Sequence, residues 1–495
     1  MTRTGRRVVV IGAGMGGLAA AIRLARAGLE VTLVEARDGP GGKMRTLPSL
    51  AGPVDAGPTV LTLRSVFDDI FETCGQRLDD HLTLLRQPLL ARHWWSDGST
   101  LDLGSDPEAN AEAIGRFAGA AEARGFRRFH DLSARLYAAF DAPMMHAAAP
   151  DQKAIALAAL RDPKIWPALL PGMSLARLLA LQFRDRRLRQ LFGRYATYVG
   201  GTPDRSPGVL ALIWAAEAQG VWAVAGGMHR LALALAKLAE AQGVSLRYGS
   251  PVARIMRQGG RVSGVQLGDG PALPCDHVVF NGDPAALLAG LLGDGPRQAV
   301  AEAQVHPCSL SAWVWSYAAI PSGLPLVHHN LFFGDDQAQE FGPILRGQMP
   351  ADPTLYLCAE DRSGGTTPTG PERFEIIMNA PPGQPLQPEE DRQCRTRTFD
   401  RLSRFGLSFD PMPGPECLTA PTGFARMFPG SQGSLYGLSP HGALASLRRP
   451  LARTSLPGLY LAGGGAHPGA GVPMAALSGR HAAEAILADL ASASR

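Results

Sequence analysis

The chain has 495 residues, 45% of them apolar and 19% charged, which is long enough for two or three domains with a large core. Its formal net charge of +4 is small for this length, and no basic tract carries interleaved aromatic residues, so we expect no nucleic-acid partner. The six cysteines are scattered without a Cys-x-x-Cys pair, so we expect no metal site and a reducing compartment.

The first predicted elements are a strand over residues 8–11, a glycine turn and a helix over residues 18–27. Gly12, Gly14 and Gly17 have the spacing of a dinucleotide-binding turn, which needs a tight bend, close approach of a pyrophosphate and close helix packing. A strand over residues 31–35 then ends in Glu35, where an acid would bind the ribose of an adenosine. The alternative is an ordinary strand–turn–helix unit without a ligand, in which the glycine spacing and the position of Glu35 would be coincidental.

After this unit, the sequence predicts short elements as far as residue 103 and mainly helices from residue 106 to 220. Residues 54–60 form a loop before a helix over 65–74, and residues 82–103 read as short strands. Residues 106–220 are predominantly helical, and their longest apolar stretch contains Glu217, so the sequence predicts no membrane-spanning helix. We do not expect the arginine-rich start to be a secretion signal, because its apolar run contains the glycine turn.

The central region alternates between helix and strands, and the region after it is predicted to consist of strands and loops. A helix over residues 231–242 precedes predicted strands over 244–248, 252–257, 262–267 and 278–281. Residues 305–435 read as strands and loops, with Trp313, Trp315 and Tyr317 on one face of a strand, where the core is their expected environment. The adjacent His328 and His329 are expected at the surface.

A second glycine-rich loop lies near the C-terminus. Residues 458–462 read as a strand, a loop rich in glycine follows, and a helix is predicted over residues 475–490. The N-terminus of such a helix can face an anionic or electron-rich group. A long cofactor needs two such loops; the alternative is a buried crossover without a ligand.

Several motifs resemble those of a known family. Gly41 and Gly42 followed by Lys43 resemble the flavin-binding signature of the amine oxidase and phytoene desaturase superfamily. Val-Asp-Ala-Gly-Pro-Thr-Val (54–60), Val-Gly-Gly-Thr-Pro (199–203), Gly-Val-Trp (220–222) with the glycine pair at 226–227, and Ala-His-Pro-Gly-Ala-Gly (466–471) resemble motifs of the bacterial phytoene desaturase-type carotenoid oxidoreductases. They fall in order across essentially the whole chain.

This resemblance implies an α/β fold with a discontinuous Rossmann-type FAD-binding domain. The domain would comprise residues 1–80, 225–295 and 452–495. A mixed α+β substrate domain would comprise residues 81–105 and 296–451, and a helical, membrane-associated insertion would comprise residues 106–224.

The resemblance also assigns cofactor contacts. The residues implied to bind FAD are Gly12, Gly14, Gly17, Gly42 and Lys43 near the phosphates, Glu35 and the backbone of Val252 at the adenosine, and Gly57, Pro58, Thr59, Gly464, Val472, Pro473 and Met474 near the ribityl chain and isoalloxazine. The family often has Asp or another small residue at the position of Gly464, so any phosphate contact there must come from the backbone N–H.

No catalytic acid–base pair is transferred, because Ala154 and Leu157 stand where some relatives have a carboxylate and an arginine. His467 is the candidate base or flavin-tuning residue. The alternative for His467 is a turn histidine that bonds to the backbone.

The activity implied by the resemblance is the FAD-dependent desaturation of an acyclic carotenoid, expected as 3,4-desaturation of a 1-hydroxylated substrate. Hydride transfer to a flavin needs no nucleophile or metal, and the sequence carries neither a hydrolase triad nor a zinc motif. Phytoene desaturation, flavin amine oxidation and non-catalytic isoprenoid binding are the alternatives. The sequence does not identify the electron acceptor.

A peripheral attachment to membrane lipid, on the cytoplasmic side, is also expected. Residues 165–173 are apolar but too short and too rich in proline to span a bilayer. After them, arginines alternate with apolar residues near helical spacing: Leu175, Leu178, Leu179, Phe183, Leu191, Phe192 and Tyr195. We expect this apolar set to dip into one leaflet; the alternative is that it packs against the rest of the protein.

Overall fold

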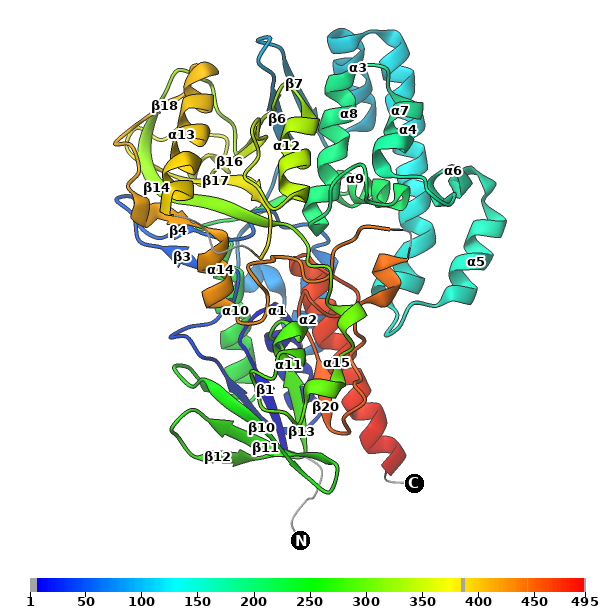
Figure 1. Cartoon of the computed structure of the whole chain (residues 1–495), viewed down its shortest axis with the longest axis vertical. Coiled ribbons are helices and arrows are strands. Elements are labelled where there is room, and N and C mark those ends of the chain that lie inside the picture. The colour runs from blue at the N-terminus through cyan, green and yellow to red at the C-terminus, as the bar shows by residue number, and fades with distance from the viewer. Residues whose placement is uncertain (1–6, 384–387, 443, 494–495) are drawn as a thin grey trace.

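The computed structural model describes residues 7–383, 388–442 and 444–493. Figure 1 shows three regions: a parallel sheet with its helices at the bottom, near both termini, a second sheet at the upper left, and a group of helices at the upper right. The predicted α/β class is confirmed.

A five-stranded parallel sheet forms the lower region, in the order β20-β13-β1-β2-β9. Its strands are β1 (Arg7–Ile11), β2 (Glu30–Val34), β9 (Ser245–Arg247), β13 (His277–Phe280) and β20 (Leu459–Leu461). In β1, Val8 and Val10 face a core shared with helices, whereas Val9 faces a core shared with the antiparallel sheet of β10 (Val252–Gln258), β11 (Arg261–Leu267) and β12 (Ala272–Pro274). Both faces of the sheet are therefore covered, which explains the continuous apolar runs of its strands.

Two helices from opposite ends of the chain cover one face of this sheet. They are α1 (Met15–Arg26) and α15 (Val472–Ala493), and α10 (His229–Ala241) packs beside α1. A Cβ atom on Gly479 would lie 2.1 Å from the carbonyl oxygen of Gly16, so α1 and α15 meet backbone to backbone. Both helices begin three residues earlier than the sequence pattern predicts.

The second sheet is mixed, in the order β18-β14-β17-β16-β15-β6-β7, with β19 beside β14. Its strands are β6 (Leu89–Trp94), β7 (Thr100–Gly104), β14 (Ser311–Ser322), β15 (His329–Phe332), β16 (Leu355–Ala359), β17 (Glu372–Ala380), β18 (Ser408–Asp410) and β19 (Leu418–Thr419). Trp313, Trp315 and Tyr317 share one buried cluster, as predicted.

Two expectations for this region are wrong. Residues 305–435 contain three helices besides strands and loops: α12 (Gln337–Leu345), α13 (Pro388–Arg404) and α14 (Pro421–Met427). His328 and His329 are buried rather than exposed, because β15 is a central strand of the sheet.

The helical region follows β7. It contains α3 (Pro107–Ala118), α4 (Ala120–Phe140), α5 (Gln152–Arg161), α6 (Trp166–Leu169), α7 (Leu175–Gln182), α8 (Arg186–Gly193) and α9 (Leu212–Ala218). Further elements are α2 (Ser65–Thr73), which packs on α1 and α15, α11 (Pro284–Leu288), which packs beside the lower sheet, and the short strands β3 (Thr46–Leu47), β4 (Val54–Asp55), β5 (Leu84–Arg86) and β8 (Trp222–Val224). No helix among the described residues is long and apolar enough to cross a membrane.

The expected membrane-facing set is wrong. All seven residues from Leu175 to Tyr195 are buried, since they pack on α4 and α9 in one aromatic-rich core. The exposed apolar side chains of the region are different ones: Leu157, Leu160, Trp166, Leu170 and Leu181.

Candidate active site

The N-terminal glycine turn connects β1 to the first turn of α1. Gly12 has φ +101°, which glycine adopts readily, and Gly14 is the N-cap of α1. A Cβ atom on Gly17 would lie 2.0 Å from the carbonyl oxygen of Gly12, so the helix can start this close to the strand only with glycine there. The free N–H groups of the first helical turn make this edge of the sheet suitable for an anion.

Asn281 joins the two glycine loops, although no sequence motif predicted this role. It follows β13 directly, and its Nδ2 donates to the carbonyl oxygen of Gly12 at 3.2 Å. Cβ atoms on Gly14 and on Gly463 would lie 2.9 Å from its Nδ2 and Oδ1. A polar residue at the carboxyl end of a buried parallel strand is a recognisable signal, because ligands bind at that edge.

The predicted adenosine residues come together at the same edge of the sheet. The Glu35 carboxylate accepts hydrogen bonds from the backbone N–H of Ala13 (2.7 Å) and of Arg37 (3.0 Å). The backbone N–H of Ser250 donates to the carbonyl oxygen of Glu35, which brings the start of β10, at Val252, beside this acid.

Two buried cations lie next to the glycine loops. Lys43, which follows Gly42, donates from Nζ to the carbonyl oxygen of Leu435 at 2.5 Å, and Arg449 donates to the carbonyl oxygen of Gly464 at 2.8 Å. Burial lowers the pKa of Lys43 and lowers that of Arg449 to about 10, while Asp283 opposes both shifts. Neither cation forms an ion pair within the described residues. Arg449 was not predicted, because nothing in its loop sequence marks it.

His467 lies in the C-terminal loop, just after the three glycines at 463–465. Its Nε2 lies 2.9 Å from the carbonyl oxygen of Ala147, and His467 is absent from the described residues that line the cavity discussed next. Burial lowers the pKa of His467 to about 4, so its ring is neutral near neutral pH. This geometry favours the structural alternative for His467 over a base at the reacting atoms.

A cavity of about 940 Å³ lies between the three regions. It brings Gly57, Pro58 and Thr59 together with Val472, Pro473 and Met474, which are the residues predicted near an isoalloxazine. Most of the remaining lining is apolar and comes from the helical region, including Met144, Ile155, Leu169, Met173, Val209, Leu212 and Ile213. Gly464 and the N-terminal glycines are not part of this lining.

Thr59 belongs to a short polar chain at the wall of the cavity. Its Oγ1 and the hydroxyl oxygen of Tyr356 are 2.6 Å apart, and the same hydroxyl lies 2.7 Å from Nδ1 of His329. Burial raises the pKa of Tyr356 and lowers that of His329, so both groups are neutral. The Tyr356 hydroxyl can therefore donate to the His329 ring and accept from Thr59.

Asp55, in the motif that contains Gly57, has a structural role. Its carboxylate accepts from the backbone N–H of Met228 (2.5 Å) and of His229 (3.2 Å) at the start of α10. A Cβ atom on Gly57 would lie 1.9 Å from the carbonyl oxygen of Lys43. The motif thus fixes the loop that carries Thr59.

The comparisons with known proteins agree with this geometry. The family model of the flavin-containing amine oxidoreductases matches residues 15–313 and 425–487. The chain is 78% identical to a hydroxyneurosporene desaturase of Cereibacter sphaeroides and 56% identical to that of Rhodobacter capsulatus, each over 99% of both chains. It is 30% identical to a 4,4'-diapolycopene oxygenase of Methylomonas, over 98% of this chain and 99% of the relative.

Solved structures show the same fold at low sequence identity. A fatty acid isomerase of P. acnes superposes with a TM-score of 0.59 at 14% identity, over 99% of both chains. A cyclohexylamine oxidase of Brevibacterium oxydans gives a TM-score of 0.57 at 18% identity, over 98% of this chain and 99% of that one.

The residues present fit FAD, the cofactor of this family. A pyrophosphate can approach the N-terminus of α1, because Gly14 and Gly17 stand where a Cβ atom would collide with neighbouring protein atoms. The positive charges of Lys43 and Arg449 suit an anionic group there. The chain belongs to the flavin-containing amine oxidoreductase family, in its carotenoid desaturase branch.

Proposed function

We propose that this chain is an FAD-dependent desaturase that introduces the 3,4 double bond into 1-hydroxyneurosporene or a similar hydroxylated acyclic carotenoid. The observation that carries the proposal is the full-length 78% identity to a hydroxyneurosporene desaturase. The long cavity with its largely apolar lining supports a polyene substrate.

The cofactor contacts are part of the same proposal. Gly12, Gly14, Gly17, Gly42 and the charge of Lys43 serve the phosphates, and Glu35 with the backbone of Val252 serves the adenosine. The residues assigned to the ribityl chain and the ring are Gly57, Pro58, Thr59, Gly464, Val472, Pro473 and Met474.

The side chains of the cavity orient the substrate, exclude water from the site and provide polar contacts. FAD held by the residues named above would supply the hydride-accepting chemistry. Apolar side chains such as Leu212 and Ile213 exclude water and align the polyene, and Thr59 and Tyr356 are polar groups beside the predicted ring position. The base that accepts the remaining proton stays unassigned.

Product spectra test this function. Neurosporene, 1-hydroxyneurosporene and phytoene are embedded separately in liposomes and incubated with the FAD-loaded protein. We expect the hydroxylated carotenoid to be converted most efficiently, to a product with a longer conjugated system, seen as a shift of its absorption to longer wavelength. Conversion confined to phytoene, or a yellow protein that oxidises only amines, would contradict the proposal.

We also propose that α5 and α6 dock on a lipid surface. Leu157, Leu160, Trp166 and Leu170 are exposed, and α5 and α6 lie at the outer edge of the helical region (Figure 1, right). Leu170 is 53% exposed and also lines the cavity, so the cavity reaches this surface. Lys153, Arg161 and Lys164 are exposed nearby and suit anionic headgroups. A carotenoid can then enter directly from the bilayer.

Flotation with anionic liposomes tests the docking. Leu160→Asp combined with Leu170→Asp is expected to release most of the protein from the vesicles while FAD stays bound. Leu291→Asp is the matched control, since Leu291 is 50% exposed but lies in the cofactor region next to α11. A double variant that still floats like the unmodified protein would place the docking surface elsewhere.

A further inference from the structure

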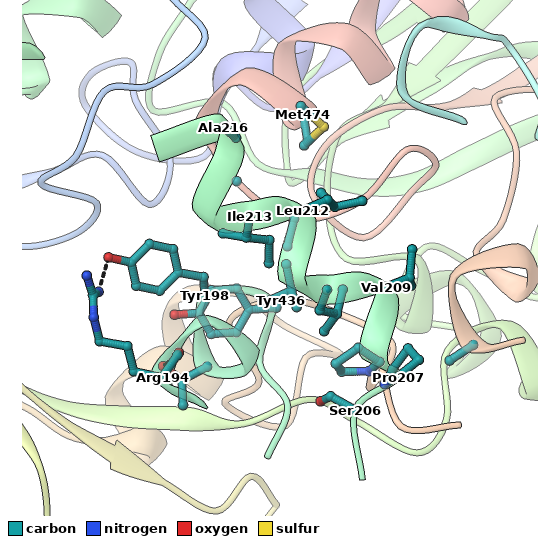
Figure 2. Close-up of a pocket in the computed structure, with 18 of the residues that line it drawn as sticks. Arg194, Tyr198, Ser206, Pro207, Val209, Leu212, Ile213, Ala216, Tyr436 and Met474 are labelled. Carbon is teal, nitrogen blue, oxygen red and sulfur yellow. Dashed lines mark hydrogen bonds between the residues drawn. The ribbon is translucent and has the colours of Figure 1, made fainter. Parts of the chain in front are cut away.

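Arg194, Tyr198 and Glu217 form a polar cluster in the wall of the mainly apolar cavity, and Figure 2 shows Arg194 and Tyr198. Arg194 begins the turn that follows α8, Tyr198 lies one helical turn later, and Glu217 comes from α9. The Arg194 guanidinium donates to the hydroxyl oxygen of Tyr198 and, at 3.4 Å, to Oε1 of Glu217. The cluster is an ion pair withdrawn from water, because Arg194 is 7% and Glu217 3% exposed.

This ion pair is incomplete within the described chain. Oε2 of Glu217 and Nε of Arg194 have no hydrogen-bond partner there. The buried pair of Arg362 and Glu372 differs, since both carboxylate oxygens of Glu372 accept hydrogen bonds from Arg362 at 2.7 Å. A buried acceptor without a partner is unfavourable, and Glu217 lines the cavity. Glu217 thus keeps one unused hydrogen-bond acceptor in a residue of the cavity wall.

The cluster shares its cavity with the residues predicted near the flavin ring. Thr59, which follows the ring-approaching Gly57 and Pro58, is hydrogen-bonded to Tyr356. Both Thr59 and Tyr356 line the cavity, as do Arg194, Tyr198 and Glu217.

We propose that Arg194, Tyr198 and Glu217 bind the hydroxyl group of the carotenoid; this inference rests on the proposed function. An alcohol donates one hydrogen bond, which Oε2 of Glu217 accepts, and it accepts hydrogen bonds from the Tyr198 hydroxyl or the Arg194 guanidinium. In a 1-hydroxylated carotenoid, three covalent bonds separate the hydroxyl oxygen from C3. Its binding site must therefore lie in the same cavity as the reacting carbons, and the cluster lines the cavity that holds the predicted ring residues.

The remaining polyene follows the apolar lining. Figure 2 shows Leu212, Ile213 and Val209 leading away from Arg194 and Tyr198 along α9 and the turn before it. The lining continues to Leu170, where the cavity reaches the surface. The hydroxylated end is thus bound at the inner end, and the rest of the chain extends toward the lipid.

The protonation states suit a neutral alcohol. Burial opposes the charged form of Arg194, but the neighbouring Tyr198, Tyr195 and Glu217 outweigh it and raise the pKa of Arg194. Burial raises the pKa of Tyr198 although Arg194 opposes this, so the phenol keeps its proton. A carotenoid without the hydroxyl would leave the polar cluster buried and unpaired, and such a site rejects the analogue.

The test compares two phenols that contact the same arginine. Tyr198→Phe removes the hydroxyl of a residue that lines the cavity, whereas Tyr195→Phe removes one that lies 3.4 Å from Arg194 on a residue outside the cavity lining. The ratio of the Kd values for neurosporene and 1-hydroxyneurosporene is measured on FAD-loaded protein by quenching of tryptophan fluorescence. The ratio of kcat/KM for 1-hydroxyneurosporene to kcat/KM for neurosporene is measured in parallel, and the melting temperature with the flavin absorbance verifies folding.

We expect Tyr198→Phe to lower both ratios roughly tenfold, by weakening binding of the hydroxylated carotenoid alone, as loss of one hydrogen bond would. Glu217→Gln, which keeps the size of the side chain, is expected to do the same, and Tyr195→Phe to leave both ratios unchanged.

Unaltered ratios in folded Tyr198→Phe and Glu217→Gln would overturn this assignment. So would an unmodified protein that converts 1-hydroxyneurosporene without preferring it to neurosporene. An unmodified protein that converts no hydroxylated carotenoid would refute the proposed function itself, and the hydroxyl site with it.

Discussion

The cofactor side of the molecule, which carries the two glycine loops, and the helical side, residues 106–224, are built in different ways. The cofactor side depends largely on the backbone: glycines where no Cβ atom fits, helix N-termini, and one asparagine that joins two loops. The helical side depends on its side chains. Its function follows from which apolar side chains are buried in the protein core and which are exposed. Where the backbone leaves no room for a Cβ atom, only glycine fits, and such glycines can be recognised in a sequence. An apolar side chain, in contrast, can be covered either by protein or by lipid, and the sequence does not distinguish the two.

The largest expected effect comes from adding a side chain to the cofactor side. Gly14→Val would place a Cβ atom 2.9 Å from Asn281 Nδ2 and more bulk in the pyrophosphate path, so we expect complete loss of flavin absorbance from the purified protein. Gly39→Ala is the control, since no atom lies within 4 Å of the added Cβ. Retention of full flavin absorbance by Gly14→Val would contradict the cofactor assignment.

Two leucines of α7 sharpen the comparison on the helical side. Leu178 is fully buried and Leu181, three residues later, is 63% exposed. We expect Leu178→Ala to lower the free energy of unfolding by about 2–5 kcal/mol and Leu181→Ala to change it by less than about 0.5 kcal/mol. Denaturant titration of both variants measures the difference; equal effects would mean that the helical core is not packed as described.

A carboxylic acid in the cavity wall gives a pH dependence. Burial raises the pKa of Glu340 from its ordinary value of 4.5 to about 7, although hydrogen bonds from Thr354 and Asn379 oppose the shift. Ionisation is then harder in the folded than in the unfolded chain, so the stability present below pH 4.5 is lost as the pH rises to about 7, by about 3 kcal/mol.

Glu340→Gln tests this pH dependence. The variant should have a flatter profile of unfolding free energy between pH 4.5 and 7 than the unmodified protein. Two profiles that run parallel over this range would show that Glu340 titrates at its ordinary pKa.

The smallest expected effect concerns the joint between the glycine loops. Asn281→Ala removes the hydrogen bond to the Gly12 carbonyl but leaves every glycine in place. We expect FAD to bind roughly tenfold more weakly, corresponding to about 1.4 kcal/mol, in equilibrium dialysis. An unchanged Kd for FAD would show that the loops hold their positions without Asn281.

Sequence patterns predicted the fold class and the elements of the cofactor side, because parallel strands and glycine turns follow local rules. They did not reveal Asn281 and Arg449, whose importance depends on residues far away in the chain. The apolar residues of 175–195, expected to face lipid, lie on α7, α8 and the turn after α8 and pack into one core, since helical spacing does not say what covers an apolar residue. Likewise, His329 was placed at the surface because its strand, β15, becomes central only through pairing with β6 and β16.

The contact between Gly16 and Gly479 has a consequence for how the protein is made. A chain emerges from the ribosome with its N-terminus first, so β1 and the first glycine turn are synthesised long before β20 and α15. The helix α1 gains its backbone-to-backbone neighbour, and β13 its outer neighbour β20, only after β20 and α15 have been synthesised. We therefore expect nascent chains that lack these two elements to remain colourless, so that the yellow of bound flavin marks molecules in which α15 is present.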